Sequence, residues 1–248
     1  MNKAVKKFFI ESIGVAKSIT FTLRPHLWLG WIEAPLRLLA NTLSLDKWID
    51  RHKALAYNDF CTWKRDYHRR YHLYQWAVNH YRLGESPIYY VEFGVSRGFS
   101  LRWWIEHCVH SESRFWGFDT FEGLPEDWGV FRAGDMAARP PLLNDQRLTL
   151  KKGLFQDTIR EWLASSPFDN PSVRKVIHID SDLRSSALYV LFQLEPYLQK
   201  GDLLLFDEFA VPNHEFIAFS LFKEATKRQV RPIGATNNYM QIIFEMEE

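Results

Sequence analysis

The fold of this chain is constrained most by the segment at residues 89–98, Tyr-Tyr-Val-Glu-Phe-Gly-Val-Ser-Arg-Gly. An apolar strand here runs through Glu92, and Gly94 and Gly98 follow before a stretch of helical character. A second apolar strand ends in Asp119, 21 positions after Gly98. Glycines let a backbone turn approach a nucleoside closely, and an acid at the tip of the next strand can accept both ribose hydroxyls. The pattern therefore predicts a nucleoside pocket in an α/β fold.

From about residue 87 onward, apolar strands alternate with helical stretches, which is typical of a doubly wound sheet. We expect a Rossmann-like α/β fold with a mostly parallel, seven-stranded sheet and an antiparallel last strand. The expected strands are 88–94, 114–119, 147–151, 173–180 and 202–208, with a closing pair in 233–247 that turns at Asn237-Asn238. The expected helices are 98–109, 155–164, 184–198 and 213–229. Residues 126–146 form a long irregular loop, and such loops are often lids or substrate contacts.

Residues 1–85 differ in character and are expected to form a helical N-terminal extension, which leaves 86–248 as the α/β domain. Breaks between helices are expected near Arg24-Pro25 and near Asp46. Residues 58–81 carry many aromatic and basic side chains at the spacing of an amphipathic helix.

The first 45 residues leave two interpretations open. Residues 26–45 contain Glu33, Pro35 and Arg37, so they do not make a membrane span. Basic and apolar side chains nevertheless alternate in a way that suits an amphipathic helix on a membrane surface; they are Lys3, Lys6, Lys7, Lys17, Phe8, Phe9, Ile13 and Ile19. The commoner alternative is a helix packed on the α/β domain or on a second subunit of a homo-oligomer.

The charge balance and the cysteines narrow the class of protein. Thirty-one basic residues against thirty acidic ones give a net charge of +1, which argues against a nucleic-acid partner. Cys61 and Cys108 have neither metal-ligand nor redox spacing, so a reducing compartment is expected. No small-residue cleavage site follows the basic N-terminus, and we expect a cytoplasmic protein with the membrane-surface alternative just given.

Carboxylates recur where strands are expected to end. Asp180 ends the strand 173–180, and Asp207 and Glu208 end the strand 202–208. Parallel strands end at one edge of a sheet, so these three side chains are expected to converge. Clustered anions repel one another unless a cation lies among them, and oxygen ligands suit Mg²⁺ or a similar ion. The alternative is that each acid caps the helix that follows it.

Taken in order, the sequence resembles the macrocin O-methyltransferase family over roughly residues 87–245. The resemblance rests on five segments: 91–98 (Val-Glu-Phe-Gly-Val-Ser-Arg-Gly), 118–125 (Phe-Asp-Thr-Phe-Glu-Gly-Leu-Pro), 153–158 (Gly-Leu-Phe-Gln-Asp-Thr), 180–182 (Asp-Ser-Asp) and 206–209 (Phe-Asp-Glu-Phe). It implies an S-adenosylmethionine-dependent enzyme that methylates a hydroxyl of a sugar or a glycosylated natural product, with help from a divalent cation.

The resemblance also assigns roles to residues. The cofactor would be held by Glu92, Gly94, Ser96, Gly98, Asp119, Thr120, Phe155 and Asp180, and Mg²⁺ by Asp180, Asp207 and Glu208. Asp180 would help to deprotonate the acceptor, and His178 and His214 are further candidates for the base. The chain departs from the family pattern at Glu208, where an aspartate is common, and at Arg184, which replaces an aromatic residue. Arg184 is either a recognition group for an anionic acceptor or a solvated arginine.

Two other functions fit parts of the sequence. A nicotinamide-dependent oxidoreductase would also place an acid about 20 residues after a glycine turn, but Gly94 and Gly98 lack the spacing of a dinucleotide fingerprint. A catalytically degenerate methyltransferase fold that serves as a scaffold would account for the long aromatic-rich extension.

Overall fold

The computed structural model describes residues 2–247, and the chain divides into two compact units, Met1–Leu43 and Ser44–Glu248. The sequence predicted a boundary near residue 85. The structure instead includes residues 44–85 in the larger unit, because they pair and pack with its sheet.

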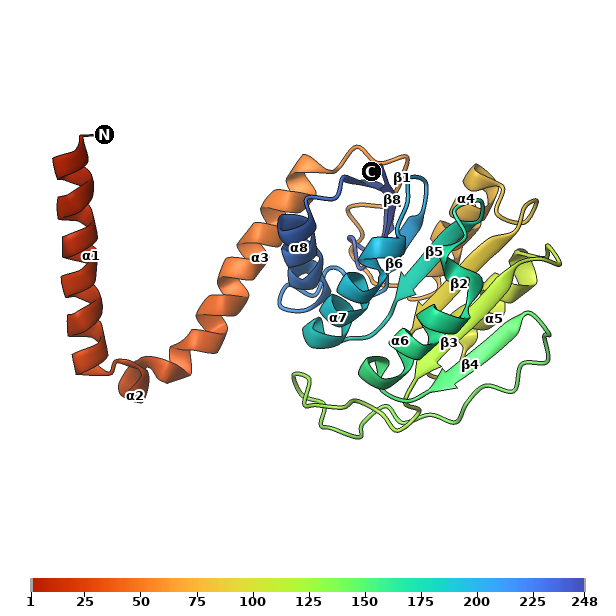
Figure 1. Ribbon diagram of the computed structural model, residues 1–248, viewed down its shortest axis with the longest axis horizontal. Coiled ribbons are helices and arrows are strands. Elements are labelled where there is room, and N and C mark those ends of the chain that lie inside the picture. The colour runs from red at the N-terminus through yellow and green to blue at the C-terminus, as the bar shows by residue number, and fades with distance from the viewer. Residues whose placement is uncertain (1, 248) are drawn as a thin grey trace. The chain divides into compact units, whose positions relative to one another are not determined.

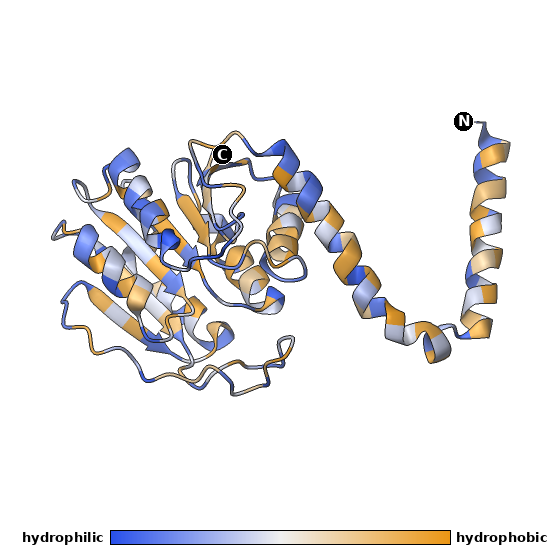
Figure 2. Cartoon of the chain, turned by 180° about the vertical axis from the view of Figure 1, so that it is seen from behind, coloured by the Kyte–Doolittle hydropathy of each residue, from blue (hydrophilic) through white to orange (hydrophobic). Residues whose placement is uncertain are grey.

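The first unit consists of helices. α1 (Lys3–Leu23) is capped by the Asn2 side chain and ends at Arg24, which adopts a left-handed conformation before Pro25. It is followed by α2 (His26–Leu29), a 3-10 turn (Gly30–Ile32) and the start of α3 (Glu33–Arg51). The break predicted near Asp46 is absent because α3 runs through it, and no glycine or proline interrupts residues 36–51. None of residues 2–43 is buried, and hydrophobic residues recur along α1 (Figure 2).

Within residues 2–247, eight strands form one sheet in the order β1-β7-β8-β6-β5-β2-β3-β4. Their bounds are β1 (Tyr57–Asn58), β2 (Ile88–Phe93), β3 (Arg114–Asp119), β4 (Leu148–Lys152), β5 (Arg174–Ile179), β6 (Leu203–Phe206), β7 (Val230–Thr236) and β8 (Gln241–Met246). All neighbouring pairs are parallel except those made by β8, which is antiparallel to β6 and β7. The predicted fold is confirmed, with β1 as an additional short edge strand.

Two helical layers cover the sheet (Figure 1). Side chains of α4 (Arg69–Tyr81) and α5 (Phe99–His107) join one buried cluster. Those of α6 (Phe155–Ser165), α7 (Arg184–Leu194) and α8 (Glu215–Thr226) join the other, together with Leu45 from the end of α3. The strand order reverses between β5 and β2, so the carboxyl ends of these strands form the crevice in which such sheets bind ligands.

The segment before α4 is irregular, with bends and a turn, rather than helical. A helix was predicted from residue 58, but α4 begins at Arg69. Asparagine side chains from the β7–β8 turn bind the intervening backbone instead: Asn238 Oδ1 accepts from the Thr62 N–H at 2.8 Å, and Asn237 Oδ1 accepts from the Asp66 N–H at 3.0 Å. These bonds hold residues 62–66 along the carboxyl edge of the sheet.

No helix among residues 2–247 combines the length and the apolar character that crossing a bilayer requires.

Candidate active site

A cavity of about 670 Å³ opens at the carboxyl ends of the central strands. Six of the eight predicted cofactor residues line it: Gly94, Ser96, Asp119, Thr120, Phe155 and Asp180. Two of the three predicted metal ligands, Asp180 and Glu208, also line it, whereas Asp207 does not. A volume in this range suits a cofactor together with a small acceptor.

The floor of the cavity depends on a glycine after β2. Gly94 has a φ of +100°, and a Cβ at this position would lie 1.8 Å from the Asp180 carbonyl oxygen. The Asp180 N–H donates to the Phe93 carbonyl at 2.9 Å, so the tips of β2 and β5 are joined directly. Only glycine allows the two backbones to approach so closely. Because Gly94 has no side chain, its backbone is also accessible to a ligand in the cavity.

Asp119 organises the cavity wall at the tip of β3. Its Oδ2 accepts from the Ser96 N–H at 2.7 Å, and its Oδ1 accepts from the Phe121 N–H at 2.6 Å. These bonds orient the carboxylate and tie the loop after β2 to the loop after β3. Each carboxylate oxygen can accept a second hydrogen bond, so Asp119 remains able to bind a pair of hydroxyls.

Glu92 and Gly98, the other two predicted cofactor residues, do not line the cavity. Glu92 is fully buried and accepts hydrogen bonds from the hydroxyls of Tyr90 (2.5 Å) and Ser100 (2.6 Å). Strand alternation places its side chain on the same face as Tyr90, toward α5, which is why it misses the cavity. Gly98 precedes α5, and a Cβ there would meet the Pro141 ring at 2.6 Å. Glu92 and Gly98 therefore support the loop between β2 and α5 through buried contacts and do not face the cavity.

One wall of the cavity is acidic. Asp180, Asp182 and Glu208 all line it. Burial and the charge of Asp207 raise the pKa of Asp180 well above its ordinary value. Burial, with Asp207 and Asp119 nearby, raises the pKa of Asp182 to about 6. Burial and Asp182 raise the pKa of Glu208 to about 7, against the opposing effect of Arg65. This wall therefore favours a cationic ligand.

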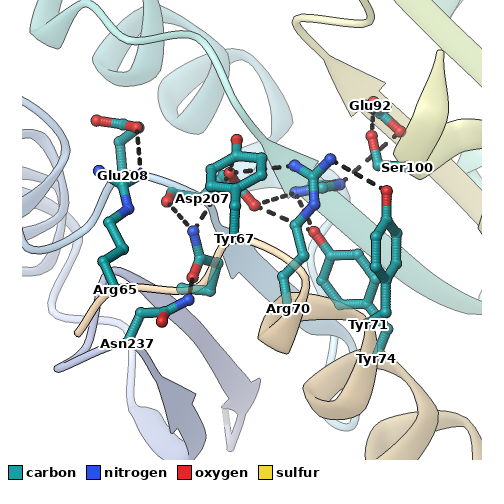
Figure 3. Close-up of polar contacts among 12 residues, drawn as sticks. Arg65, Tyr67, Arg70, Tyr71, Tyr74, Glu92, Ser100, Asp207, Glu208 and Asn237 are labelled. Carbon is teal, nitrogen blue, oxygen red and sulfur yellow. Dashed lines mark hydrogen bonds and ion pairs between the residues drawn. The ribbon is translucent and has the colours of Figure 1, made fainter. Parts of the chain in front are cut away.

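Asp207 lies behind this wall, enclosed by protein donors (Figure 3). The hydroxyls of Tyr67 and Tyr74 donate to it at 2.6 Å and 3.1 Å, and Arg70 Nη1 lies 3.4 Å from its Oδ2. Burial opposes the charge of Asp207, but His178 and Arg70 outweigh burial and hold its pKa well below the usual range. Asp207 is therefore a buried, compensated anion.

Neither histidine predicted as a base lines the cavity. His178 is fully buried, with Nδ1 2.9 Å from the Tyr90 hydroxyl and Nε2 3.3 Å from the Tyr74 hydroxyl. Burial alone would lower the pKa of His178, but Asp207 and Glu92 raise it to about 10, so the ring is a cation at neutral pH and cannot act as a base. His214 stacks edge-on against Trp128, and burial and Arg184 lower its pKa.

The predicted metal ligands do not form a set that fits a divalent cation. In the described part of the chain, one group of three side chains has its ligand atoms within 4.8 Å of one another: His178, Asp180 and Asp207. Glu208 is not in this group. Both ring nitrogens of His178 already face tyrosine hydroxyls, and both oxygens of Asp207 accept from tyrosines. Charge compensation at Asp207 thus comes from the protein.

Several cavity residues escaped the sequence analysis. Arg65 and Tyr67 line the cavity from the irregular segment before α4, and Trp128 and Phe131 line it from the loop after β3. The rings of Trp128 and Phe131 stack at 5.3 Å. The loop 126–146 had been predicted as a substrate contact, and the structure brings it to the cavity. Nothing in the local sequence around Arg65 points to the cavity, because its place depends on the β7–β8 turn. Arg184 is exposed and does not line the cavity.

Comparison with known proteins agrees with this geometry. Residues 91–209 match a family model described as a methyltransferase domain. The matched segment covers 119 of the 248 residues. It contains every predicted cofactor residue and both acidic strand ends, but not Arg65, Tyr67 or Arg70.

The chain shares its fold with solved structures of low sequence identity. CalS11, described as a calicheamicin methyltransferase, superposes with a TM-score of 0.57 at 21% identity, over 72% of this chain and 79% of that chain. The O-methyltransferase NovP superposes with a TM-score of 0.53 at 18% identity, over 73% of this chain and 80% of that chain. None of the curated proteins matches the sequence significantly. The family match indicates a methyltransferase. The solved structures show the fold that this chain shares with two proteins described as methyltransferases.

Proposed function

We propose that this methyltransferase transfers a methyl group from S-adenosylmethionine to a hydroxyl of a sugar or a glycosylated small molecule. The observation that carries the proposal is one cavity that is lined by Asp119, whose carboxylate is oriented by backbone N–H groups, and by the carboxylates of Asp180 and Asp182. The stacked Trp128 and Phe131 at its mouth offer apolar faces of the kind that cover sugar rings. An apo structure of CalS11, described as a TDP-rhamnose 3'-O-methyltransferase, has a TM-score of 0.50 at 21% identity, over 72% of this chain and 80% of that chain, and supports the acceptor class.

The positions of the cavity residues would fix the orientation of the cofactor. Asp119 would accept the ribose hydroxyls, and Phe155, at the first position of α6, would contact the adenine. The methionine end would then lie over Gly94, with the acidic wall facing the positively charged sulfur. S-Adenosylmethionine supplies an electrophilic methyl group that leaves by in-line displacement, so the enzyme's task is alignment of the acceptor oxygen and removal of its proton.

Proton removal falls to a carboxylate that reaches the acceptor. Asp180 and Asp182 line the cavity, whereas His178 is enclosed in the core and His214 lies behind Trp128. The pKa of Asp180 is raised further than that of Asp182, which favours the protonated form of Asp180. A protonated carboxyl group cannot accept the proton of the acceptor, so Asp182 is the better base of the two. Assistance by Mg²⁺ remains a prediction of the sequence; the residues present do not fit the ion, and no step here uses it.

Calorimetric titration with S-adenosylhomocysteine tests the proposal first, followed by turnover assays with a panel of nucleotide-linked sugars and glycosides. We expect saturable binding near one molecule per chain and methylation of at least one glycosyl acceptor. An Asp182→Asn variant should keep the binding and lose the turnover. Absence of S-adenosylhomocysteine binding would contradict the proposal and favour a degenerate scaffold.

A further inference from the structure

The first unit displays an apolar surface that no side chain within it covers. Large apolar side chains in residues 3–31 are strongly exposed, among them Phe8 (70%), Trp28 (60%) and Trp31 (78%). Figure 2 shows how such residues recur along α1. Contiguous exposed apolar surface of this kind marks an interaction site.

On α1, five of the nine large apolar side chains share one face. Val5, Phe8, Val15, Ile19 and Leu23 follow one another at spacings of three, seven, four and four residues, which places them in one stripe. The other face is basic, and it is defined by Lys3, Lys6, Lys7 and Lys17, with Ile10 and Phe21 set among them. Glu11 is the single acid of α1, and it lies 3.9 Å from Lys7.

This distribution of charge selects the partner. Lysines on the same helix as an apolar stripe attract it to an anionic surface, and the stripe then enters the apolar layer. A second copy packed on the stripe would cover the apolar side chains but would leave the lysines without an anionic partner. Tryptophans such as Trp28 and Trp31 prefer the boundary between lipid and water.

We propose that residues 3–31 bind the surface of an anionic lipid membrane in the plane of the interface. The apolar stripe of α1 is buried among the lipid chains, and the lysines contact the headgroup phosphates. The methyltransferase is thereby recruited to a membrane, where an acceptor carried on a lipid would be concentrated.

The test is co-sedimentation of the full chain with phosphatidylcholine vesicles that either contain or lack phosphatidylglycerol. Two double variants make the same chemical change on opposite faces of α1. Phe8→Gln with Ile19→Gln removes apolar groups from the stripe, and Phe21→Gln with Ile10→Gln removes them from the basic face. The two residues of each pair are 11 positions apart, so the pairs are matched in geometry as well.

We expect binding only when phosphatidylglycerol is present, with a loss at high salt. The stripe variant should bind roughly tenfold more weakly or worse, while the basic-face variant should stay within about threefold of the unmodified protein. Equal binding to neutral vesicles, equal loss in both variants, or no binding would overturn the proposal. Concentration-dependent dimers that need the stripe, without vesicle binding, would assign the surface to a second copy instead.

A separate observation at the acidic wall of the cavity, and directly behind it, carries a second inference. Two adjacent acids at the end of β6 are each matched to an arginine from residues 65–70: Arg70 Nη1 lies 3.4 Å from Asp207 Oδ2, and Arg65 Nη2 lies 3.4 Å from Glu208 Oε1 (Figure 3). The Arg70 guanidinium is buried and also lies over the ring of Tyr67, 4.1 Å from the ring centroid. A fixed cation therefore already occupies the position that would compensate Asp207.

We infer that Arg70, with Arg65, takes the charge-compensating place of a divalent cation, so that the enzyme works without a metal. This inference rests on the proposed function. Titration with Mn²⁺, followed by calorimetry, should show no saturable binding by the unmodified protein, and EDTA should leave S-adenosylhomocysteine affinity unchanged.

The matched variants are Arg70→Gln and its neighbour Arg69→Gln, which loses a 3.0 Å ion pair to Asp59 but touches no cavity acid. We expect Arg70→Gln alone to acquire Mn²⁺ affinity at least about tenfold above that of the unmodified protein, because Asp207 then keeps only one of its two neighbouring cations, His178. Stoichiometric Mn²⁺ binding by the unmodified protein, or no gain in a folded Arg70→Gln, would overturn the inference. Loss of S-adenosylhomocysteine binding in every protein would instead contradict the proposed function.

Discussion

At the scale of single residues, Asp119 combines a structural and a binding task. Its two carboxylate oxygens accept from the backbone N–H groups of Ser96 and Phe121, which fixes the carboxylate at the cavity wall. The remaining lone pairs face the cavity that the residue lines. A carboxylate held in this way binds hydroxyls without losing side-chain freedom at the moment of binding.

Asp119→Ala should weaken S-adenosylhomocysteine binding by about tenfold to a hundredfold, because hydrogen bonds to a charged group contribute roughly 1.5–3 kcal/mol. Calorimetric titration measures the change. Asp157→Ala, which removes an exposed carboxylate in the first turn of α6, is the control and should leave the affinity unchanged. Equal affinity in both variants would show that Asp119 does not hold the ribose.

His178 gives a prediction about stability. Its pKa is raised from 6.5 to about 10 in the folded protein, so its contribution is fully present below pH 6.5 and is lost as the pH rises through about 10. Asp207, whose pKa is lowered, contributes above its ordinary value of 3.8 and loses its contribution in acid. The ion pair therefore stabilises the fold at neutral pH.

His178→Gln should lower the free energy of unfolding by about 3 kcal/mol at neutral pH, since it leaves buried carboxylates with less compensation. Urea unfolding at neutral pH and above pH 10 measures the difference, which should shrink at the higher pH. The exposed His72→Gln serves as the control. A deficit that does not depend on pH would mean that His178 is not a cation in the folded state.

At the scale of elements, the site depends on contacts between loops that follow different strands. The turn after β2 touches the end of β5 through Gly94, and the β7–β8 turn holds residues 62–66 in place. The expected helices and strands after residue 87 formed within a few residues of their predicted bounds, because their apolar spacing is local information. The irregular course of residues 59–68 is not local, since it is imposed by Asn237 and Asn238.

Gly94→Ala should destabilise the fold by roughly 3 kcal/mol or more and abolish S-adenosylhomocysteine binding, because a left-handed conformation and a backbone clash add up. Thermal unfolding and calorimetry report the two effects. The matched control is Gly129→Ala, at a φ of +58° with no atom within 4 Å of the added Cβ, where only the backbone strain applies. Similar losses at both positions would argue against the close approach to Asp180.

At the scale of the whole molecule, the two units differ in how they are stabilised. None of residues 2–43 is buried, whereas Leu45 joins the core and the Trp48 ring packs 5.0 Å from that of Phe209. The larger unit has a continuous core on both faces of its sheet. Its stability should therefore not depend on the first unit.

A chain of residues 44–248 should fold and bind S-adenosylhomocysteine within about twofold of the full chain, because none of residues 2–43 is buried. It should also lose binding to anionic vesicles. Calorimetry and co-sedimentation test the two statements separately. A large loss of S-adenosylhomocysteine affinity would show that the first unit contributes to the cavity.

The sequence by itself determined the α/β fold and gathered most of the predicted cofactor residues at the carboxyl edge of the sheet, because strand periodicity and strand-end residues are local features. Gly94, Asp119, Phe155 and Asp180 line the cavity as the sequence predicted. Only the tertiary structure decided which acids face the cavity and which are compensated in the core. Asp207 and Glu208 are neighbours in sequence, yet strand alternation and the arrival of Arg70 and Tyr67 from a distant segment bury one and leave the other at the wall.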